Sequence, residues 1–416
     1  MAKHAAKKTK CAEHGVWTGV PTPAPAGQQP LDLSAIDADE NQRIISSGKM
    51  RFAMVGCSGD PNTPTNTEAV ARAITAGTDT SFFFHLGDII YLETGSDATT
   101  DGSEVGDMPA LWNSQFYAPY TDYPKRIVSI GGNHDGKSSP VTDYLDAFCA
   151  DPSTWPQPWT GNTTDARPAM IQPYAYWRFD TPLAYIVGLY SNIANGGILD
   201  DPTAYPVFTD GPQYQWLVGE LKAVAAANRG NSPKKAVLLA VHYPPYSGAT
   251  NFNVRGDPSQ GPGPDVSNAP YLAVALQQAF ADSGLRPDAI FSAHAHLFEH
   301  LTYTFADGTV MPCLVTGCGG HAPLEVLSDR CDGKPGAPLT APFPAVTPGS
   351  FQFPQGDSAQ VEYYEDGDSA NSAFGFLKLT IEARTLTCHF IGATSNQTLH
   401  QFTLNLDTHQ YSAVNA

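Results

Sequence analysis

The sequence predicts an α/β fold in which two mixed β-sheets are covered by helices. First, short apolar runs typical of buried strands alternate along the chain with segments of helical pattern. Second, the segments at 174–187 and 375–390 each contain two strand-like runs separated by a turn, which is typical of antiparallel hairpins. Third, polar residues repeatedly follow the carboxyl end of an apolar run, where α/β folds place their functional sites.

In the first part of the chain, three apolar runs end at or next to a glycine, as expected of strands that finish in a turn: 50–55, 81–86 and 126–130. The capping box Thr-Asn-Thr-Glu at 65–68 predicts a helix over residues 69–76, which Gly77 closes.

The second part of the chain repeats this alternation. Helices are predicted over 213–228 and 270–283, and strands at 236–241 and 289–293. The hairpin strands are predicted at 174–179 with 183–187, and at 375–381 with 386–390.

We expect one domain over residues 48–405. Residues 1–47, rich in Ala, Pro, Gly, Gln and Lys, are expected to form an irregular tail, and residues 406–416 a short C-terminal tail. The segment 152–173, rich in Pro, Trp, Thr and Asn, is expected to be a long loop that roofs a cleft.

Composition excludes several classes of protein. The net charge of −18 gives a field that repels nucleic acid and anionic membranes, so neither is expected as a partner. No run of 18 apolar residues is present, so no membrane span is expected. The basic N-terminus lacks a following apolar stretch, and the seven cysteines include no Cys-x-x-Cys pair; both favour a reducing, cytoplasmic location. The sequence does not indicate an oligomeric state.

Five segments carry residues suited to metal chemistry. Asp88 emerges at Gly87 from a strongly apolar strand, where a buried carboxylate needs a compensating cation. Tyr91 follows three residues later, and Asn133-His134-Asp135 follows the strand at 126–130. Read alone, Asp88 could instead be a turn aspartate or a helix cap, and Asn133 a turn residue.

The histidines form the rest of the pattern. His242 leaves an otherwise apolar strand, and taken alone it is more often structural than a ligand. His294 and His296 are two residues apart at a strand end, so the pleat places both on one face. Together, the carboxylate, phenol, amide and imidazole groups are the ligands that a pair of hard-to-borderline metal ions requires, which indicates metal-assisted hydrolysis of a phosphate ester.

These segments resemble the calcineurin-like metallophosphoesterases and, among them, the small purple acid phosphatases. Gly87-Asp88-Ile-Ile-Tyr91 is similar to Gly-Asp-x-x-Tyr, and Gly132-Asn133-His134-Asp135 is similar to Gly-Asn-His-Asp/Glu. Val241-His242-Tyr-Pro-Pro245 resembles the single-histidine segment, and Ala293-His294-Ala-His296 resembles Gly-His-x-His. The motifs occur in the family's order over roughly residues 50–400.

The resemblance implies a four-layer α/β/β/α sandwich with a dinuclear metal centre. It implies that Asp88 bridges two ions, one bound by Tyr91 and His296 and the other by Asn133, His242 and His294. It implies that His134 assists the leaving group, and we count Asp135 with it among the catalytic residues. Metal-bound hydroxide would attack phosphorus in line. The phenolate of Tyr91 suggests iron, with iron, zinc or manganese beside it.

The sequence departs from the family at the first ligand, which is an Asp directly after the strand glycine. Here Cys57 follows Gly56, and the next carboxylate is Asp60. Three alternatives follow: Cys57 binds the metal ion as a thiolate, Asp60 extends into the metal site from a rearranged turn, or this site binds its ion more weakly. A hard ferric ion prefers a carboxylate, so we expect Asp60 to be the ligand.

The expected activity is that of an acid-phosphatase-type phosphomonoesterase acting on a small phosphorylated substrate. Two alternatives remain: a phosphodiesterase on the same scaffold, and a non-catalytic member that binds phosphorylated ligands.

Overall fold

The computed structural model describes residues 30–77, 79–91, 108–137, 142–149, 172–191, 198, 209, 211–249, 269–327, 353–368 and 373–415. Residues 1–29 of the expected N-terminal tail, residues 152–171 of the expected roofing loop, and Ala416 lie outside these ranges.

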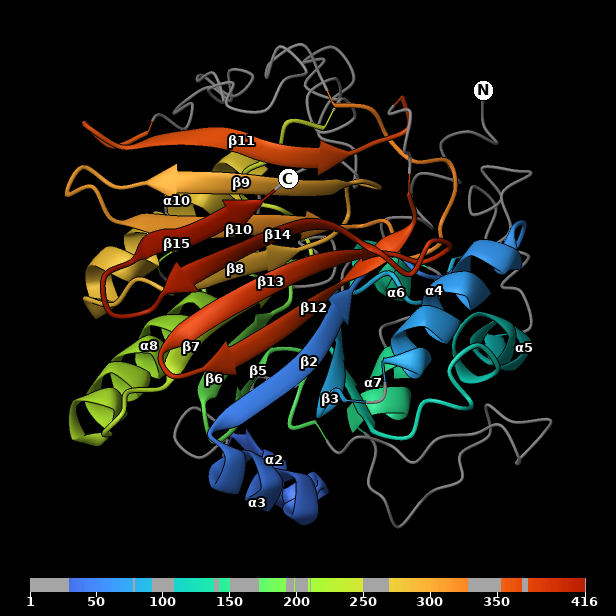
Figure 1. Ribbon diagram of the computed structural model, residues 1–416, viewed down its shortest axis with the longest axis horizontal. Coiled ribbons are helices and arrows are strands. Elements are labelled where there is room, and N and C mark those ends of the chain that lie inside the picture. Colours follow the sequence, from blue (N-terminus) through green and yellow to red (C-terminus); the bar gives the residue numbers. More distant parts are fainter. Residues whose placement is uncertain are drawn as a thin grey trace, which may run out of the picture.

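Two mixed β-sheets form the centre of the described structure, as the sequence predicts (Figure 1). One is a seven-stranded sheet with the strands, in spatial order, β15 (Gln410–Asn415), β14 (Thr398–Asn405), β13 (Thr385–Gly392), β12 (Gly375–Glu382), β2 (Lys49–Val55), β3 (Phe82–His85) and β4 (Arg126–Ser129). The other is an eight-stranded sheet with β1 (Leu31–Asp32), β5 (Trp177–Asp180), β6 (Ala184–Leu189), β7 (Ala236–Val241), β8 (Ala289–Ser292), β10 (Val310–Thr316), β9 (Phe298–Thr304) and β11 (Ser358–Glu365).

Each sheet contains a group of neighbouring parallel strands. In the seven-stranded sheet, β2, β3 and β4 are parallel neighbours, and in the eight-stranded sheet β6, β7 and β8 are. Parallel strands present their carboxyl ends at one edge, so the loops that follow them gather there. The expected hairpins are confirmed, since β5 pairs antiparallel with β6 and β12 with β13.

Helices cover the outer faces. They are α2 (Leu33–Ile36), α3 (Ala38–Ser47), α4 (Pro64–Ala76), α5 (Met108–Trp112), the π-helical turn η2 (Asn113–Tyr117), α6 (Asn133–Lys137), α7 (Thr142–Cys149), α8 (Pro212–Gly230) and α10 (Ala269–Ser283). In Figure 1, α4 to α7 lie beside β2 and β3, on the opposite side from α8.

The alternation of side chains along β7 shows why both faces of its sheet are covered. Leu238 belongs to the hydrophobic cluster between the two sheets, whereas Val237 and Leu239 belong to the cluster that contains Leu221 of α8 and Leu276 of α10. When both faces of a strand are buried, its sequence is a continuous apolar run, and this is the pattern from which β7 was predicted. Together the sheets and helices form the expected layered α/β fold.

Some elements differ from the sequence prediction. Residues 33–47, expected to be irregular, contain α2 and α3, and β15 continues the seven-stranded sheet beyond residue 405. Helix α4 begins at Pro64 instead of residue 69, because proline suits the first helical turn. Strands β9, β10, β11 and β14 were not predicted.

A buried polar cluster connects β9 of the eight-stranded sheet with β14 of the seven-stranded sheet. His300 of β9 and His400 of β14 are both buried, and their Nδ1 and Nε2 atoms are 2.9 Å apart. Nε2 of His300 is 3.0 Å from the hydroxyl of Tyr411, which is also 2.9 Å from the hydroxyl of Thr302. Within the described residues, no helix is long and apolar enough to cross a membrane.

Candidate metal centre

Five loops bring the predicted side chains together, and each follows the carboxyl end of a strand. The loops after β2, β3 and β4 belong to the seven-stranded sheet and carry Cys57, Asp88 and Asn133. The loops after β7 and β8 belong to the eight-stranded sheet and carry His242 and the 294–296 segment. The candidate site is therefore built from both sheets.

The carboxylate of Asp88 lies at the centre of this group. Its Oδ2 accepts a hydrogen bond from the Tyr91 hydroxyl at 3.0 Å and lies 3.2 Å from Nε2 of His242. Its Oδ1 accepts the backbone N–H of His134 at 2.8 Å. Burial alone would raise the pKa of Asp88, but His242 and His134 outweigh burial and hold that pKa well below its usual range. The site therefore contains a buried anion surrounded by ligand atoms.

Two further contacts extend the group. Oδ1 of Asn133 is 3.1 Å from Nε2 of His242 and 3.0 Å from Nδ1 of His294. The Tyr91 hydroxyl is 3.2 Å from Nε2 of His296. The structure thus brings together six of the predicted metal ligands: Asp88, Tyr91, Asn133, His242, His294 and His296.

The hydrogen bonds of His242 indicate that a cation fits here. Its Nδ1 is 2.7 Å from the carbonyl oxygen of Leu86, which can only accept, so Nδ1 carries a proton. In a neutral ring, Nε2 then presents a lone pair to two oxygen atoms, those of Asp88 and Asn133. Burial alone would lower the pKa of His242, but Asp88 outweighs burial and raises it. Either a proton or a metal ion must therefore compensate these three atoms, and nitrogen and oxygen ligands of this kind suit zinc, iron or manganese.

The backbone is held in unusual conformations at three residues of the candidate site. Cys57, Asp88 and His294 have φ angles of 52°, 55° and 65°, in the left-handed region that residues other than glycine rarely adopt. Such conformations concentrate at functional sites, where surrounding contacts enforce them. Gly132 is also required, because a Cβ at this position would lie 2.2 Å from Oδ1 of Asp88.

Asp135, which we predicted to be catalytic, accepts hydrogen bonds from four backbone N–H groups. Its Oδ2 accepts the backbone N–H groups of Asp88 at 2.9 Å and Gly132 at 2.8 Å. Its Oδ1 accepts those of Ile89 at 2.9 Å and Ile90 at 3.2 Å. With both oxygens directed at backbone amides, Asp135 is a positioning residue that holds the Asp88 loop.

Asp60 lies elsewhere than we expected of a metal ligand. Its Oδ1 accepts the backbone N–H groups of Asn62 and Thr63 at 2.7 and 2.8 Å. Its Oδ2 accepts the Thr63 hydroxyl at 2.5 Å and the backbone N–H of Ala322 at 3.0 Å. The carboxylate thus fixes the turn that leads into α4.

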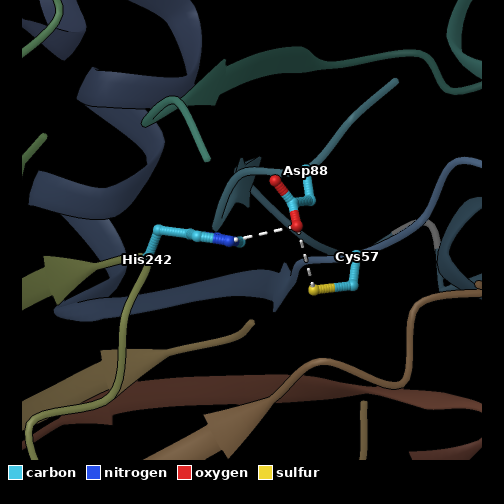
Figure 2. A group of neighbouring side chains, drawn as sticks. All are labelled: Cys57, Asp88 and His242. Carbon is cyan, nitrogen blue, oxygen red and sulfur yellow. Dashed lines mark hydrogen bonds and ion pairs between the residues drawn. The ribbon is translucent and has the colours of Figure 1, made fainter. Parts of the chain in front are cut away.

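Cys57, and not Asp60, is the side chain next to Asp88. Figure 2 shows the His242 ring and the Cys57 sulfur both directed at the Asp88 carboxylate. The ligand atoms of these three buried residues all lie within 4.8 Å of one another. Sequence reasoning considered Cys57 but favoured the harder ligand.

Sequence reasoning missed two residues that support Tyr91. The ring of His321 stacks on the Tyr91 ring with centroids 3.6 Å apart, and its Nδ1 is 2.9 Å from the carbonyl oxygen of Gly59. Gln115 accepts the Tyr91 N–H at 2.9 Å and donates to the Tyr91 carbonyl at 2.7 Å. His321 follows a glycine-rich segment, 317–320, at the end of β10, which is a signal that could have revealed it.

Comparison with known proteins agrees with this fold. The model of the family described as calcineurin-like phosphoesterase matches residues 50–298, which is more than half of the chain. The chain therefore belongs to the calcineurin-like phosphoesterase family, whose members are metal-dependent phosphoester hydrolases. No curated protein matches the chain.

Solved structures that resemble this chain at low sequence identity include GAP50 and PhoD. GAP50, described as the anchor in the inner membrane complex of Plasmodium, is 15% identical with a TM-score of 0.52, and the match covers 86% of this chain and 89% of that one. PhoD is 13% identical with a TM-score of 0.47, over 88% of this chain and 72% of that one. At these identities, the likeness to GAP50 supports the fold alone.

Proposed function

We propose that this protein hydrolyses small phosphomonoesters, as an acid-phosphatase-type enzyme with a dinuclear metal centre. The observation that carries the proposal is that the Asp88 carboxylate is shared by two groups of ligand atoms. Tyr91 and His296 form the first group with it, and Asn133, His242 and His294 form the second.

In this proposal, Asp88, Tyr91 and His296 hold one ion, and Asp88, Asn133, His242 and His294 hold the other. The phenol of Tyr91 supports iron at the first position, with iron, zinc or manganese at the second. Bound ions would supply Lewis-acid stabilisation of the attacking and leaving oxygens and make a water molecule more acidic.

His134 is suited to handle the proton of the leaving group. It is only half-buried, while Asp88 and Tyr91 are almost completely buried. Its backbone is fixed to Oδ1 of Asp88 at 2.8 Å, and its ring centroid lies 4.2 Å from that of Tyr91. We therefore assign His134 the role of protonating the oxygen of the departing alcohol.

The test combines metal analysis with hydrolysis. The purified chain is stripped of metal, reloaded with iron, zinc or manganese, and assayed with p-nitrophenyl phosphate and with bis(p-nitrophenyl) phosphate. We expect two ions per chain, and faster hydrolysis of the monoester below neutral pH than of the diester.

Three outcomes would contradict the proposal. Hydrolysis of the diester alone would assign a phosphodiesterase. Binding of phosphate or a phosphomonoester without turnover, at saturating metal, would assign a non-catalytic member. A single bound ion with full activity would exclude the dinuclear centre. An Asp122→Asn variant, altered at an exposed carboxylate, is the matched control for any site variant.

A further inference from the structure

Cys57 differs from the hard ligands around it, because it brings sulfur into a site of oxygen and nitrogen atoms. We propose that Cys57 binds, together with Asp88 and His242, the second ion of the centre as a thiolate, so that this position takes a borderline divalent ion such as Zn²⁺ in preference to ferric iron. This inference rests on the proposed metal centre and names the class of metal that it accepts.

The position of the sulfur atom supports this role. Sγ of Cys57 lies 4.0 Å from Oδ2 of Asp88 and accepts the backbone N–H of His294 at 3.2 Å. Cys57 has no exposed surface, and Asp88 and His242 are at most 1% exposed. Three ligand atoms from three strand ends therefore converge within 4.8 Å, which is a spacing suited to one ion.

The neighbours of Cys57 argue against a purely packing role. A buried free cysteine usually behaves as a small apolar residue among other apolar residues. Here the sulfur faces the carboxylate of Asp88 and the backbone amide of His294. By contrast, Cys313 of β10 packs in the apolar cluster beneath α8 and α10. The two cysteines are equally buried, so they form a natural pair for comparison.

Asp60, the carboxylate that we expected as the ligand, is already engaged elsewhere. Both oxygens of Asp60 accept hydrogen bonds from the turn before α4 and from Ala322, four in total. Turning Asp60 toward Asp88 would break these bonds and bring two carboxylates together. The Cys57 sulfur already lies beside Asp88, so it could bind an ion there without breaking the hydrogen bonds of this turn.

Binding is a proton exchange without a redox change. The S–H bond of Cys57 breaks, a sulfur–metal bond forms, and the proton is released to solvent. Thiolate ligands select zinc and other borderline or soft ions over hard ones.

Cobalt(II) is the probe for this inference, because thiolate ligation produces a sulfur-to-cobalt charge-transfer band in the near ultraviolet. The full-length protein is stripped of metal and titrated with Co²⁺ under reducing conditions. We expect the band to saturate at one thiolate per chain, to disappear in Cys57→Ser, and to persist in the matched control Cys313→Ser. Circular dichroism verifies that each variant is folded.

A second variant keeps the inference testable if Cys57→Ser does not fold. Cys57→Asp restores a carboxylate ligand, and we expect it to bind metal without the band. We also expect it to lower the affinity for Cd²⁺ relative to Mn²⁺ by at least about tenfold.

The outcomes separate this inference from the proposed function. If the wild-type protein binds two ions and hydrolyses p-nitrophenyl phosphate but shows no band, the thiolate is wrong and the function stands. A band that persists in Cys57→Ser also overturns the thiolate. If the band forms but no substrate is hydrolysed with any metal, the thiolate stands and the proposed function fails.

Discussion

Asp135 holds the backbone of Asp88, whose N–H group donates to Oδ2 of Asp135 at 2.9 Å. The same carboxylate accepts three more backbone amides, from Ile89, Ile90 and Gly132. Asp88 has a left-handed backbone conformation, so this carboxylate stabilises a turn that is unfavourable by itself. The central residue of the candidate site is thus positioned by a neighbour whose two carboxylate oxygens accept backbone amides.

The first prediction concerns Asp135→Asn. An amide can accept with one oxygen only, so two of the four backbone N–H groups lose their partner. We expect unfolding by urea to show a loss of about 2–3 kcal/mol of stability. The kcat for p-nitrophenyl phosphate should also fall, and Asp122→Asn should change neither value. Wild-type stability in Asp135→Asn would show that these hydrogen bonds do not hold the loop.

The second prediction concerns Asp88→Asn. The substitution keeps the shape of the side chain but removes the charge that faces His242 and the proposed ions. We expect kcat to fall by about 10³-fold or more, which corresponds to several kcal/mol of lost transition-state stabilisation. Elemental analysis of the same sample should show fewer than two ions per chain. Full turnover by this variant would exclude the proposed centre.

The third prediction concerns Asp60→Ala. The variant removes the acceptor for the turn before α4, so thermal or urea unfolding should show a loss of about 2 kcal/mol. Because Asp60 is engaged with this turn, the number of bound ions should remain the same as in the wild-type protein. Loss of one ion without a loss of stability would restore Asp60 as the ligand.

The fourth prediction is a dependence of stability on pH. Burial lowers the pKa of His400 from 6.5 to about 4. Burial, together with the charge of the neighbouring His400, lowers the pKa of His300 well below its usual value. Below pH 6.5 the unfolded chain therefore binds protons that the folded protein excludes. Stability is present above pH 6.5 and is lost as the pH falls toward 4. His400 alone should contribute a loss of about 2 kcal/mol between pH 7.5 and pH 5.

Urea unfolding at several pH values measures this loss. The groups that face the pair are Tyr411 from β15 and Tyr363 from β11, whose ring stacks on His400 with centroids 4.4 Å apart. The substitution His400→Phe retains a ring at this place and should flatten the pH dependence between pH 4 and 6.5. An unchanged slope would assign the acid sensitivity to other groups.

The sequence predicted the parallel strands well, because β2, β3, β7 and β8 are apolar on both faces and end at a polar residue or glycine. It failed for β9, β11 and β14, which mix His, Glu, Thr and Tyr with apolar residues. His300 and His400 show why, since their ring nitrogens lie 2.9 Å apart although the two residues are one hundred positions apart in the sequence.

The same limit applies to the candidate site. Six of the candidate ligands could be predicted because each lies in a short motif that follows a strand. The choice between Cys57 and Asp60 depends on the amide of Ala322, 262 residues from Asp60. The residues next to Asp60 in the sequence do not reveal its contact with Ala322. Chemical preference alone favoured Asp60, whereas Cys57 is the side chain that lies beside Asp88.

The origin of the ligands in two sheets has a consequence for the core. Asp88 and Asn133 follow strands of one sheet, and His242 and His294 follow strands of the other. The distance between the two sheets therefore affects how far apart these side chains lie. Phe298 and Phe390 stack across the gap between the sheets with centroids 3.9 Å apart. Because packed interiors transmit small displacements, side chains at such contacts set the distance between the two halves of the centre. Aromatic residues of the core that do not contact a substrate therefore help to set the geometry of the candidate site.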